Sequence, residues 1–459
     1  MKTMNLMKTL CIGFLVLILA TISYIVLKNF VFMFDDDILY VAHHIYDNNL
    51  YFYDRICDYG ARFCPLQFFD YNIIKIFDYN NRYFLTPYYI LLKFFISIIL
   101  FIFIIKDIEK FNKLKINFFT QIFFLLFFII NSVFEIAMDV KFSELMQGIC
   151  VLLFILFYQK WYFTNKTKYF IWALLSCIYA TYMKETMFIP FFVIGITGLL
   201  FSDKKNKSAR ALNLLLILNG IIYLILYIMV YKSCYSKDLY FIIHPCTEGF
   251  KKVYTFKLVL LFSFIRGYKF FKTKKISLYD NFLFAGCAFA IVMYILNLRY
   301  EYYYWISHMF LSVFLVYYFN KIYNKLWKVS ICIIMSFCIY KFLIENYYCY
   351  KWSNHRRKNT ITFINNTKNR DVILLGDNYI FKKYNQYLFA IDNILYIENL
   401  NEKEILNIVK NLNVNKEYVF ITININFNLI NDKFTITPFN FFSYSWGNEA
   451  IQTFIMTPK

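Results

Sequence analysis

The sequence predicts an α-helical polytopic membrane protein that ends in a small α/β domain. Two observations predict this class. Hydrophobic residues make up 60% of the 459 residues, a share well above that of soluble globular proteins. Apolar runs of about 16–25 residues, long enough to cross a hydrocarbon core of roughly 30 Å, recur over the first three-quarters of the chain.

The apolar runs predict about eleven transmembrane helices in a domain of residues 1–345. They are 10–34, 84–105, 117–134, 145–159, 168–183, 186–201, 211–231, 253–268, 280–298, 303–320 and 329–345. The first run follows a basic start, as a signal peptide would, but no cleavage pattern of small residues precedes Asp35. We therefore interpret this run as an uncleaved anchor.

The basic residues predict the orientation of the spans. Lysine and arginine gather in six alternate segments, namely the amino terminus and the stretches around 106–115, 160–168, 204–210, 266–275 and 321–328. The positive-inside rule makes these segments cytoplasmic. The long loop 35–83 and everything after residue 346 then lie on the outer face of the plasma membrane. Topology accounts for the 49 Lys and Arg residues against 29 Asp and Glu, so we expect no nucleic-acid partner.

The composition changes after residue 345. Residues 346–369 are polar and basic and predict a linker. Residues 370–459 predict a small outer α/β domain, with strand-like runs at 371–376 and 418–424 and helical spacing of apolar residues at 402–412.

Four cysteines fall in predicted outer loops and leave two alternatives open. Cys57 with Cys64, and Cys234 with Cys246, are close enough in sequence to form disulfides in an oxidising compartment. Unpaired thiols are the equal alternative for each pair.

The most informative motif is the triplet Asp35-Asp36-Asp37, directly after the first span. Carboxylates at the mouth of a span are unfavourable unless they face water, a partner or a substrate. One carboxylate is enough to cap a helix, so three in a row favour a functional site. His43 and His44 follow in a stretch that can form a juxtamembrane amphipathic helix, where they point to different sides and do not make a metal pair.

The organisation of residues 1–345 resembles the GT-C superfamily of membrane glycosyltransferases, similar to dolichyl-phosphate-mannose mannosyltransferases and aminoarabinose transferases. The motifs that carry the resemblance are Phe34-Asp35-Asp36-Asp37, the loop residues Gly60, Arg62, Phe63, Pro65 and Leu66, the pair Lys184-Glu185, and Arg299-Tyr300. The chain departs from better-known members in having Asp-Asp-Asp rather than Asp-Glu, so the catalytic position is defined only within the triplet.

The resemblance implies transfer of a sugar from a polyprenyl-phosphate donor to a glycan, lipid or protein acceptor on the outer face, with the membrane lipid as a further partner. Asp36 is the predicted general base, because a middle residue can turn inward while Asp35 and Asp37 cap the helix. Arg62, Lys184 and Arg299 are predicted to bind the donor phosphate, and Glu185, His43, Tyr300 and Asp139 to contact substrate. No cofactor is predicted; a divalent metal bridging Asp36 and Asp139 is the alternative.

Three other interpretations compete with this one. Lys184-Glu185, between two apolar runs, is equally consistent with a tight polar turn containing a local ion pair. The whole chain is alternatively a transporter or flippase of a lipid-linked glycan, although its spans carry few charges. A membrane O-acyltransferase would need an intramembrane histidine, but His308 lies near the start of a span, where we expect it to face an interface.

Overall fold

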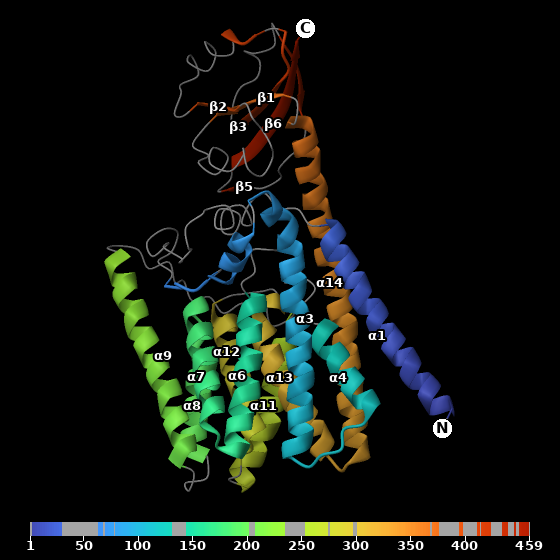
Figure 1. Cartoon of the computed structure of the whole chain (residues 1–459), viewed down its shortest axis with the longest axis vertical. Coiled ribbons are helices and arrows are strands. Elements are labelled where there is room, and N and C mark those ends of the chain that lie inside the picture. Colours follow the sequence, from blue (N-terminus) through green and yellow to red (C-terminus); the bar gives the residue numbers. More distant parts are fainter. Residues whose placement is uncertain are drawn as a thin grey trace. The chain divides into compact units, whose positions relative to one another are not determined.

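The computed structural model contains a helical bundle and a β-sheet, joined by one long helix (Figure 1). The residues that it describes are 2–29, 63–67, 69–77, 79–130, 144–201, 207–234, 253–273, 276–296, 301–367, 370–375, 394–397, 411–413, 415–423, 434–438, 445–446 and 449–458. The chain forms two compact units, and the boundary along the long helix falls between Cys349 and Tyr350.

Each of the eleven predicted spans overlaps one α-helix of the structure. These helices are α1 (Lys2–Asn29), α3 (Tyr79–Phe111), α4 (Phe118–Ile130), α6 (Glu144–Thr164), α7 (Thr167–Met183), α8 (Phe188–Phe201), α9 (Lys207–Cys234), α11 (Tyr254–Thr273), α12 (Leu278–Ile295), α13 (Trp305–Lys321) and α14 (Lys325–Thr367). Two short 3-10 helices, η2 (Phe69–Ile76) and η3 (Glu301–Tyr304), precede α3 and α13. Segments of α1, α3, α6, α9, α12 and α14, six helices of the described chain, are long and apolar enough to cross a membrane. This agrees with the predicted class, a helical membrane protein.

Consecutive helices from α6 to α13 run in alternating directions (Figure 1). The turns between α6 and α7 and between α13 and α14 therefore lie at one end of the bundle. Figure 1 shows the turn between α3 and α4 at the same end. We call this the basic end, because lysines occupy each of these turns or the helix ends beside them. The turn between α7 and α8 lies at the opposite end.

Helix α13 forms the centre of the bundle, and every residue from Trp305 to Tyr317 is buried. Such burial fits a helix that is apolar on all sides. His308 is fully buried on α13, so the prediction that it faces an interface was wrong. Its Nε2 lies 3.1 Å from the carbonyl oxygen of Phe127, in the last turn of α4, where helix carbonyls lack partners within the helix. The rings of Trp305 and Phe342 also pack against it.

Helices α8 and α9 approach closely because glycines line their contact. An added Cβ at Gly195 would lie 2.7 Å from the carbonyl oxygen of Asn213, and one at Gly198 would lie 2.4 Å from its side-chain nitrogen. The hydroxyl of Tyr158, on α6, donates a 2.7 Å hydrogen bond to the Asn213 side chain. Small residues and a buried polar contact of this kind are typical of helix packing in membranes.

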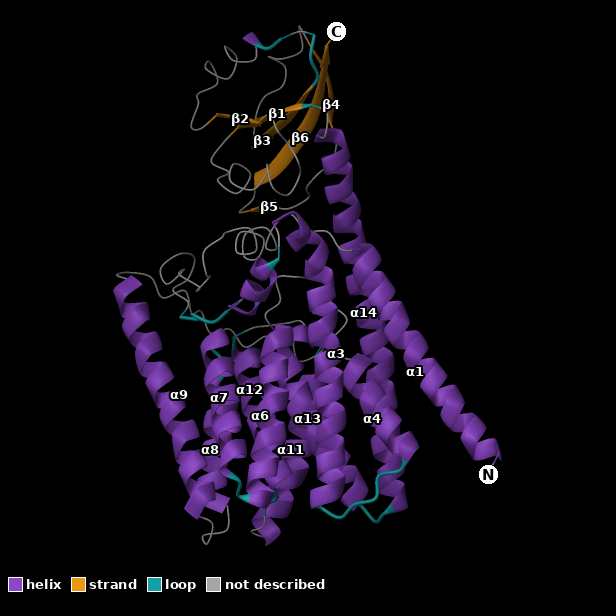
Figure 2. Cartoon of the chain, in the orientation of Figure 1, coloured by secondary structure: helices purple, strands orange, loops and turns teal. Residues whose placement is uncertain are grey.

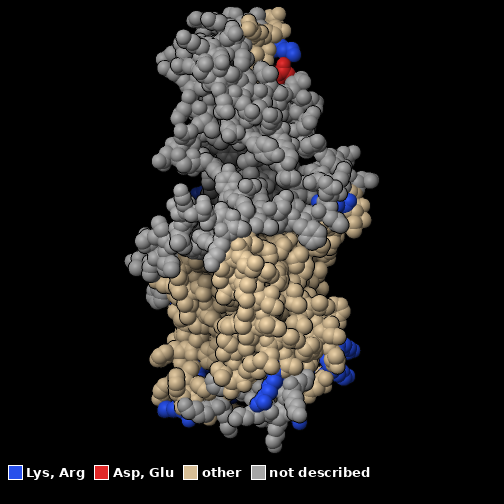
Figure 3. Space-filling view, turned by 90° about the vertical axis from the view of Figure 1, so that its left-hand side faces the viewer, with Lys and Arg blue, Asp and Glu red and all other residues tan. Residues whose placement is uncertain are grey.

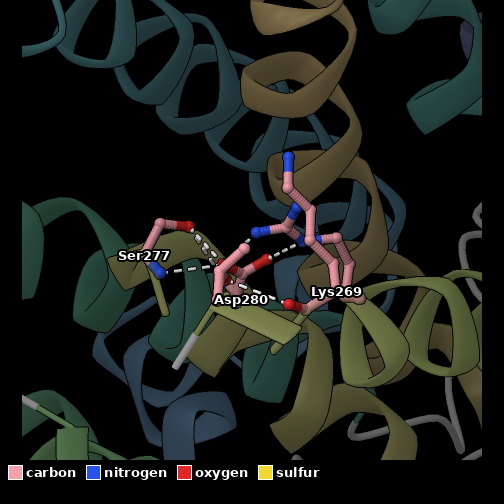
Figure 4. A network of polar contacts seen from close by, with 5 residues as sticks. Lys269, Ser277 and Asp280 are labelled. Carbon is pink, nitrogen blue, oxygen red and sulfur yellow. Dashed lines mark hydrogen bonds and ion pairs between the residues drawn. The ribbon is translucent and has the colours of Figure 1, made fainter. Parts of the chain in front are cut away.

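An ion pair joins α11 to α12 at the basic end. The Arg266 guanidinium donates two hydrogen bonds to Asp280, of 2.6 and 2.7 Å. Asp280 also accepts from the backbone N–H and the hydroxyl of Ser277, the residue that caps α12 (Figure 4). This capping box satisfies donors at the start of α12 and fixes the carboxylate where the arginine meets it.

Helix α14 continues through most of the predicted linker, since residues 346–367 are helical and belong to one helix of 43 residues. The sequence of α14 contains neither proline nor glycine, so no residue interrupts the helix where its composition turns polar. The prediction of a change at this point was based on composition, which does not by itself end a helix.

The second unit holds a mixed β-sheet (Figure 2). Its strands are β1 (Asp371–Leu375), β2 (Ile394–Ile397), β3 (Tyr418–Ile423), β4 (Phe434–Pro438), β5 (Ser445–Trp446) and β6 (Glu449–Pro458). Strands β2, β1 and β3 are parallel, and β6 pairs antiparallel with β3 and β4. Both predicted strands, β1 and β3, are present. Residues 402–410 of the predicted helix lie outside the described residues. Lys416 pairs with Asp371 at the start of β1.

Candidate functional site

The turn between α7 and α8 carries the two predicted site residues that the structure describes, Lys184 and Glu185. Lys184 ends α7 in an extended backbone conformation, and the Met187 N–H closes the turn by donating to the Lys184 carbonyl oxygen at 3.0 Å. The extended conformation separates the two side chains, so each meets a different part of the bundle.

Lys184 forms an ion pair with Glu144, the first residue of α6. The carboxylate lies at the positive end of the α6 dipole as well as beside the ammonium. Burial lowers the pKa of Lys184, but the carboxylates of Glu144 and Glu185 outweigh it and raise the pKa above its ordinary value. Lys184 is therefore a stable cation. Its Nζ also lies 5.6 Å from the ring centre of Tyr303, on η3, within cation–π range.

Glu185 accepts a hydrogen bond from the Cys64 thiol, at 3.0 Å. Cys64 is buried and carries a thiol rather than a disulfide. Of the two alternatives for Cys57 and Cys64, the thiol holds in this structure. The side chains of Cys234 and Cys246, the other candidate pair, lie outside the described residues.

Cys64 belongs to a segment that crosses this end of the bundle, residues 63–67 and 69–77, which we call the strap. Its first anchor is aromatic: the ring of Phe63 packs 6.1 Å from that of Tyr182 and 5.8 Å from that of Tyr223. The Tyr223 hydroxyl donates to the Phe63 carbonyl oxygen at 2.6 Å. The Leu66 N–H donates to the Tyr182 carbonyl oxygen at 3.1 Å. The strap is thus attached to both α7 and α9.

The second anchor of the strap is a buried ion pair with α3. The Lys93 ammonium lies 2.9 Å from Oδ2 of Asp70 and is 4.2 and 4.7 Å from the ring centres of Tyr71 and Tyr89. The Tyr89 hydroxyl lies 3.1 Å from the same carboxylate oxygen. The other oxygen, Oδ1, has no hydrogen-bond partner within the described part of the chain. These contacts hold η2 against the first turns of α3.

Described residues close in sequence to Arg62, Asp139 and Tyr300 contact this turn. Phe63 directly follows Arg62, and Tyr303 lies three residues after Tyr300. Glu144 follows Asp139 by five residues. Cys64, Tyr303 and Glu144 all contact Lys184 or Glu185. The other predicted site residues, Asp35, Asp36, Asp37, His43, Arg62, Asp139, Arg299 and Tyr300, lie outside the described residues.

Sequence reasoning missed several members of this arrangement. Lys93 had a recognisable signal, since a lysine inside an apolar run implies a buried partner. The sequence did offer Glu144, directly before the predicted span 145–159, as an acidic residue of the second outer loop that could lie near the site. The sequence singled out Cys64 only as a possible disulfide partner of Cys57, and it did not single out Tyr303. The contacts of both residues join segments that are distant in sequence.

The described residues contain no group of three or more His, Cys, Asp or Glu side chains that could hold a metal ion. The proposed bridge between Asp36 and Asp139 lies outside them. No protein-family model matches the sequence, and no curated protein matches it significantly.

Proposed function

We propose that this protein is an integral-membrane glycosyltransferase that transfers a sugar from a polyprenyl-phosphate donor to an acceptor on the outer face. The observation that carries the proposal is the convergence at the α7–α8 turn. Described residues near Arg62, Asp139 and Arg299-Tyr300 in the sequence each contact Lys184 or Glu185 there. A transferase site needs a base, cations and substrate contacts from separate segments to meet in one place.

The charges of the described part of the site divide the roles further. Lys184 pairs with Glu144 and lies within electrostatic range of Glu185, so these three side chains together carry no excess positive charge. A leaving phosphate needs fixed cations. We therefore assign the main phosphate contacts to Arg62 and Arg299, while Lys184 contributes a cation held in position by Glu144.

We assign proton abstraction from the acceptor hydroxyl to Asp36, with Asp35 and Asp37 beside it. A carboxylate within hydrogen-bond reach of the attacking hydroxyl is the usual base for such a step. The bond that breaks joins the anomeric carbon to the phosphate oxygen, and polyprenyl phosphate leaves. Its tail stays in the lipid, so the site must lie at the membrane surface.

The proposal includes a topology. All eleven helices cross the membrane, the amino terminus is cytoplasmic, and residues 370–459 form a domain on the outer face of the plasma membrane. Alternating helix directions support this arrangement, and so do the lysines at the basic end. The α7–α8 turn is then on the outer side.

The test is transfer by membranes that contain the full-length protein, supplied with a panel of synthetic polyprenyl-phosphate monosaccharides. Mass spectrometry measures the polyprenyl phosphate released. Asp36→Asn keeps the shape of the side chain and removes the base, so release should fall by roughly 10²–10⁴-fold at unchanged protein level. Lys272→Gln, an exposed charge at the basic end, is the control and should leave release unchanged.

Full transfer by each of the three single Asp→Asn variants would exclude the triplet as the base. Failure of the unaltered protein to release polyprenyl phosphate from any member of the panel would overturn the proposed donor class.

A transporter or flippase of a lipid-linked glycan is the second candidate. The observation that favours it is the ion pair of Asp70 and Lys93, because charges buried within a membrane bundle often mark a transport path. Reconstituted vesicles distinguish the two functions. A flippase moves a fluorescent lipid-linked glycan between leaflets without releasing polyprenyl phosphate, whereas a transferase releases it.

A further inference from the structure

Two lysines flank the α4 helix at the basic end. The Nζ of Lys8, on α1, lies 6.0 Å from the ring centre of Phe118, the first residue of α4. The Nζ of Lys328, in the first turn of α14, lies 5.3 Å from the ring of Phe319 on α13. Phe319 in turn packs 5.6 Å from Phe124 of α4. Aromatic rings therefore fix both cations beside the same helix.

A third cation, Lys115, is exposed in the turn that leads into α4. Among the described acidic residues of this end, Asp107 pairs with Lys160 and Asp280 with Arg266. Glu109 accepts a 3.0 Å hydrogen bond from the Ile116 backbone N–H. Within the described ranges, Lys8, Lys115 and Lys328 have no carboxylate partner. These three cations are available to an anion from outside the protein.

The surface beside these lysines is apolar and exposed. On α1, Leu10 is 63% exposed, and on α14, Val329 and Ile333 are 54% and 64% exposed. Figure 3 shows the general pattern, with lysine and arginine side chains at the lower margin of a belt of uncharged residues. A molecule that contacts both the cations and this belt must be amphipathic, with an anionic head and an apolar tail.

We propose that Lys8, Lys115 and Lys328 bind the headgroup of an anionic phospholipid whose acyl chains lie along α1, α4 and α14. A soluble anion would meet the same charges but leave the adjoining apolar side chains uncovered. A lysine near an anionic lipid surface contributes about 1 kcal/mol, which corresponds to roughly a 5-fold change in affinity. The site is independent of the proposed transferase activity.

The test uses the full-length protein in detergent, titrated with phosphatidylglycerol or with phosphatidylcholine, and native mass spectrometry counts the lipid that stays bound. The unaltered protein should retain phosphatidylglycerol in preference to phosphatidylcholine. Lys8→Gln, Lys115→Gln and Lys328→Gln together should weaken this retention by at least an order of magnitude, roughly 5-fold for each lysine. The matched control replaces Lys166, Lys168 and Lys272, three exposed lysines of the same end, by glutamine. This control variant should retain phosphatidylglycerol nearly as well as the unaltered protein.

Equal loss in the control triple variant would show a general charge effect and overturn the site, as would unchanged retention in the Lys8, Lys115 and Lys328 variant. Glycerol phosphate supplies the headgroup chemistry without the tail. If it displaces phosphatidylglycerol at equal concentration, the site is one for soluble anions and the lipid assignment is wrong. Size-exclusion profiles of both triple variants should match that of the unaltered protein.

Discussion

Lys93 and Asp70 form an ion pair of 2.9 Å in which the two side chains are only 3% and 2% exposed. Lys93 lies inside the apolar run of α3, and its partner comes from η2 in the strap, 23 residues earlier. Because neither charge reaches water, each depends on the other. The pair therefore fastens the loop that precedes α3 to the bundle.

Replacing only the lysine should destabilise the protein strongly. Lys93→Met leaves the Asp70 carboxylate buried without its cation, and the expected loss is about 3–5 kcal/mol. The double variant Asp70→Leu with Lys93→Met replaces the pair by apolar side chains and should recover most of the lost stability. Thermal unfolding in detergent measures the stability of the single and the double variant. A single variant as stable as the unaltered protein would contradict the buried pair.

Lys184 and Glu144 should show a favourable coupling in a double-mutant cycle. Lys184→Met, Glu144→Gln and the double variant should give a coupling of about 0.5–3 kcal/mol in unfolding free energy, because the two partners contact directly. The raised pKa of Lys184 keeps this contribution present below about pH 10.5, its ordinary pKa. The contribution should be lost as pH rises through the still higher pKa of the folded state. A coupling near zero at neutral pH would show that the two side chains act separately.

Gly195→Ala should separate α8 from α9. The new Cβ would lie 2.7 Å from the backbone oxygen of Asn213 and 2.8 Å from Ile217, and a backbone atom cannot move aside cheaply. The expected destabilisation is about 1–3 kcal/mol. Gly267→Ala, in α11, is the matched control: its Cβ meets nothing within 4 Å, so it should stabilise the helix by about 0.5–1 kcal/mol. Equal effects of the two substitutions would argue against close packing of α8 on α9.

Cysteine labelling in intact cells should distinguish the two ends of the bundle. Ile76, in the strap, is 81% exposed, and Lys113 is exposed in the α3–α4 turn at the basic end. A membrane-impermeant thiol reagent should modify Ile76→Cys in intact cells but reach Lys113→Cys only after lysis, each measured above the labelling of the unaltered protein. The reverse pattern would invert the proposed topology.

Local sequence was sufficient to locate the helices. Each predicted span overlaps a helix because a long apolar run without proline or glycine clusters has few alternatives to a helix in a membrane. Strands β1 and β3 were recognisable for a similar local reason, since both are short runs rich in β-branched and aromatic residues. By contrast, the end of α14 was misplaced, because polar composition changes the environment of a helix without ending it.

Tertiary structure decided which side chains meet. The sequence offered Glu185 as the neighbour of Lys184, yet the ion pair forms with Glu144, 40 residues away, because α6 begins beside the point where α7 ends. The hydrogen bond between Cys64 and Glu185 also joins distant segments, because 121 residues separate the two side chains in the sequence. His308 is buried because α4 and α14 cover α13, a fact about neighbours that its position near the start of a span could not supply. Periodicity and hydropathy are properties of one segment, so the sequence determined the elements. A contact depends on the packing of two segments, so only the folded structure determined which of the described side chains meet.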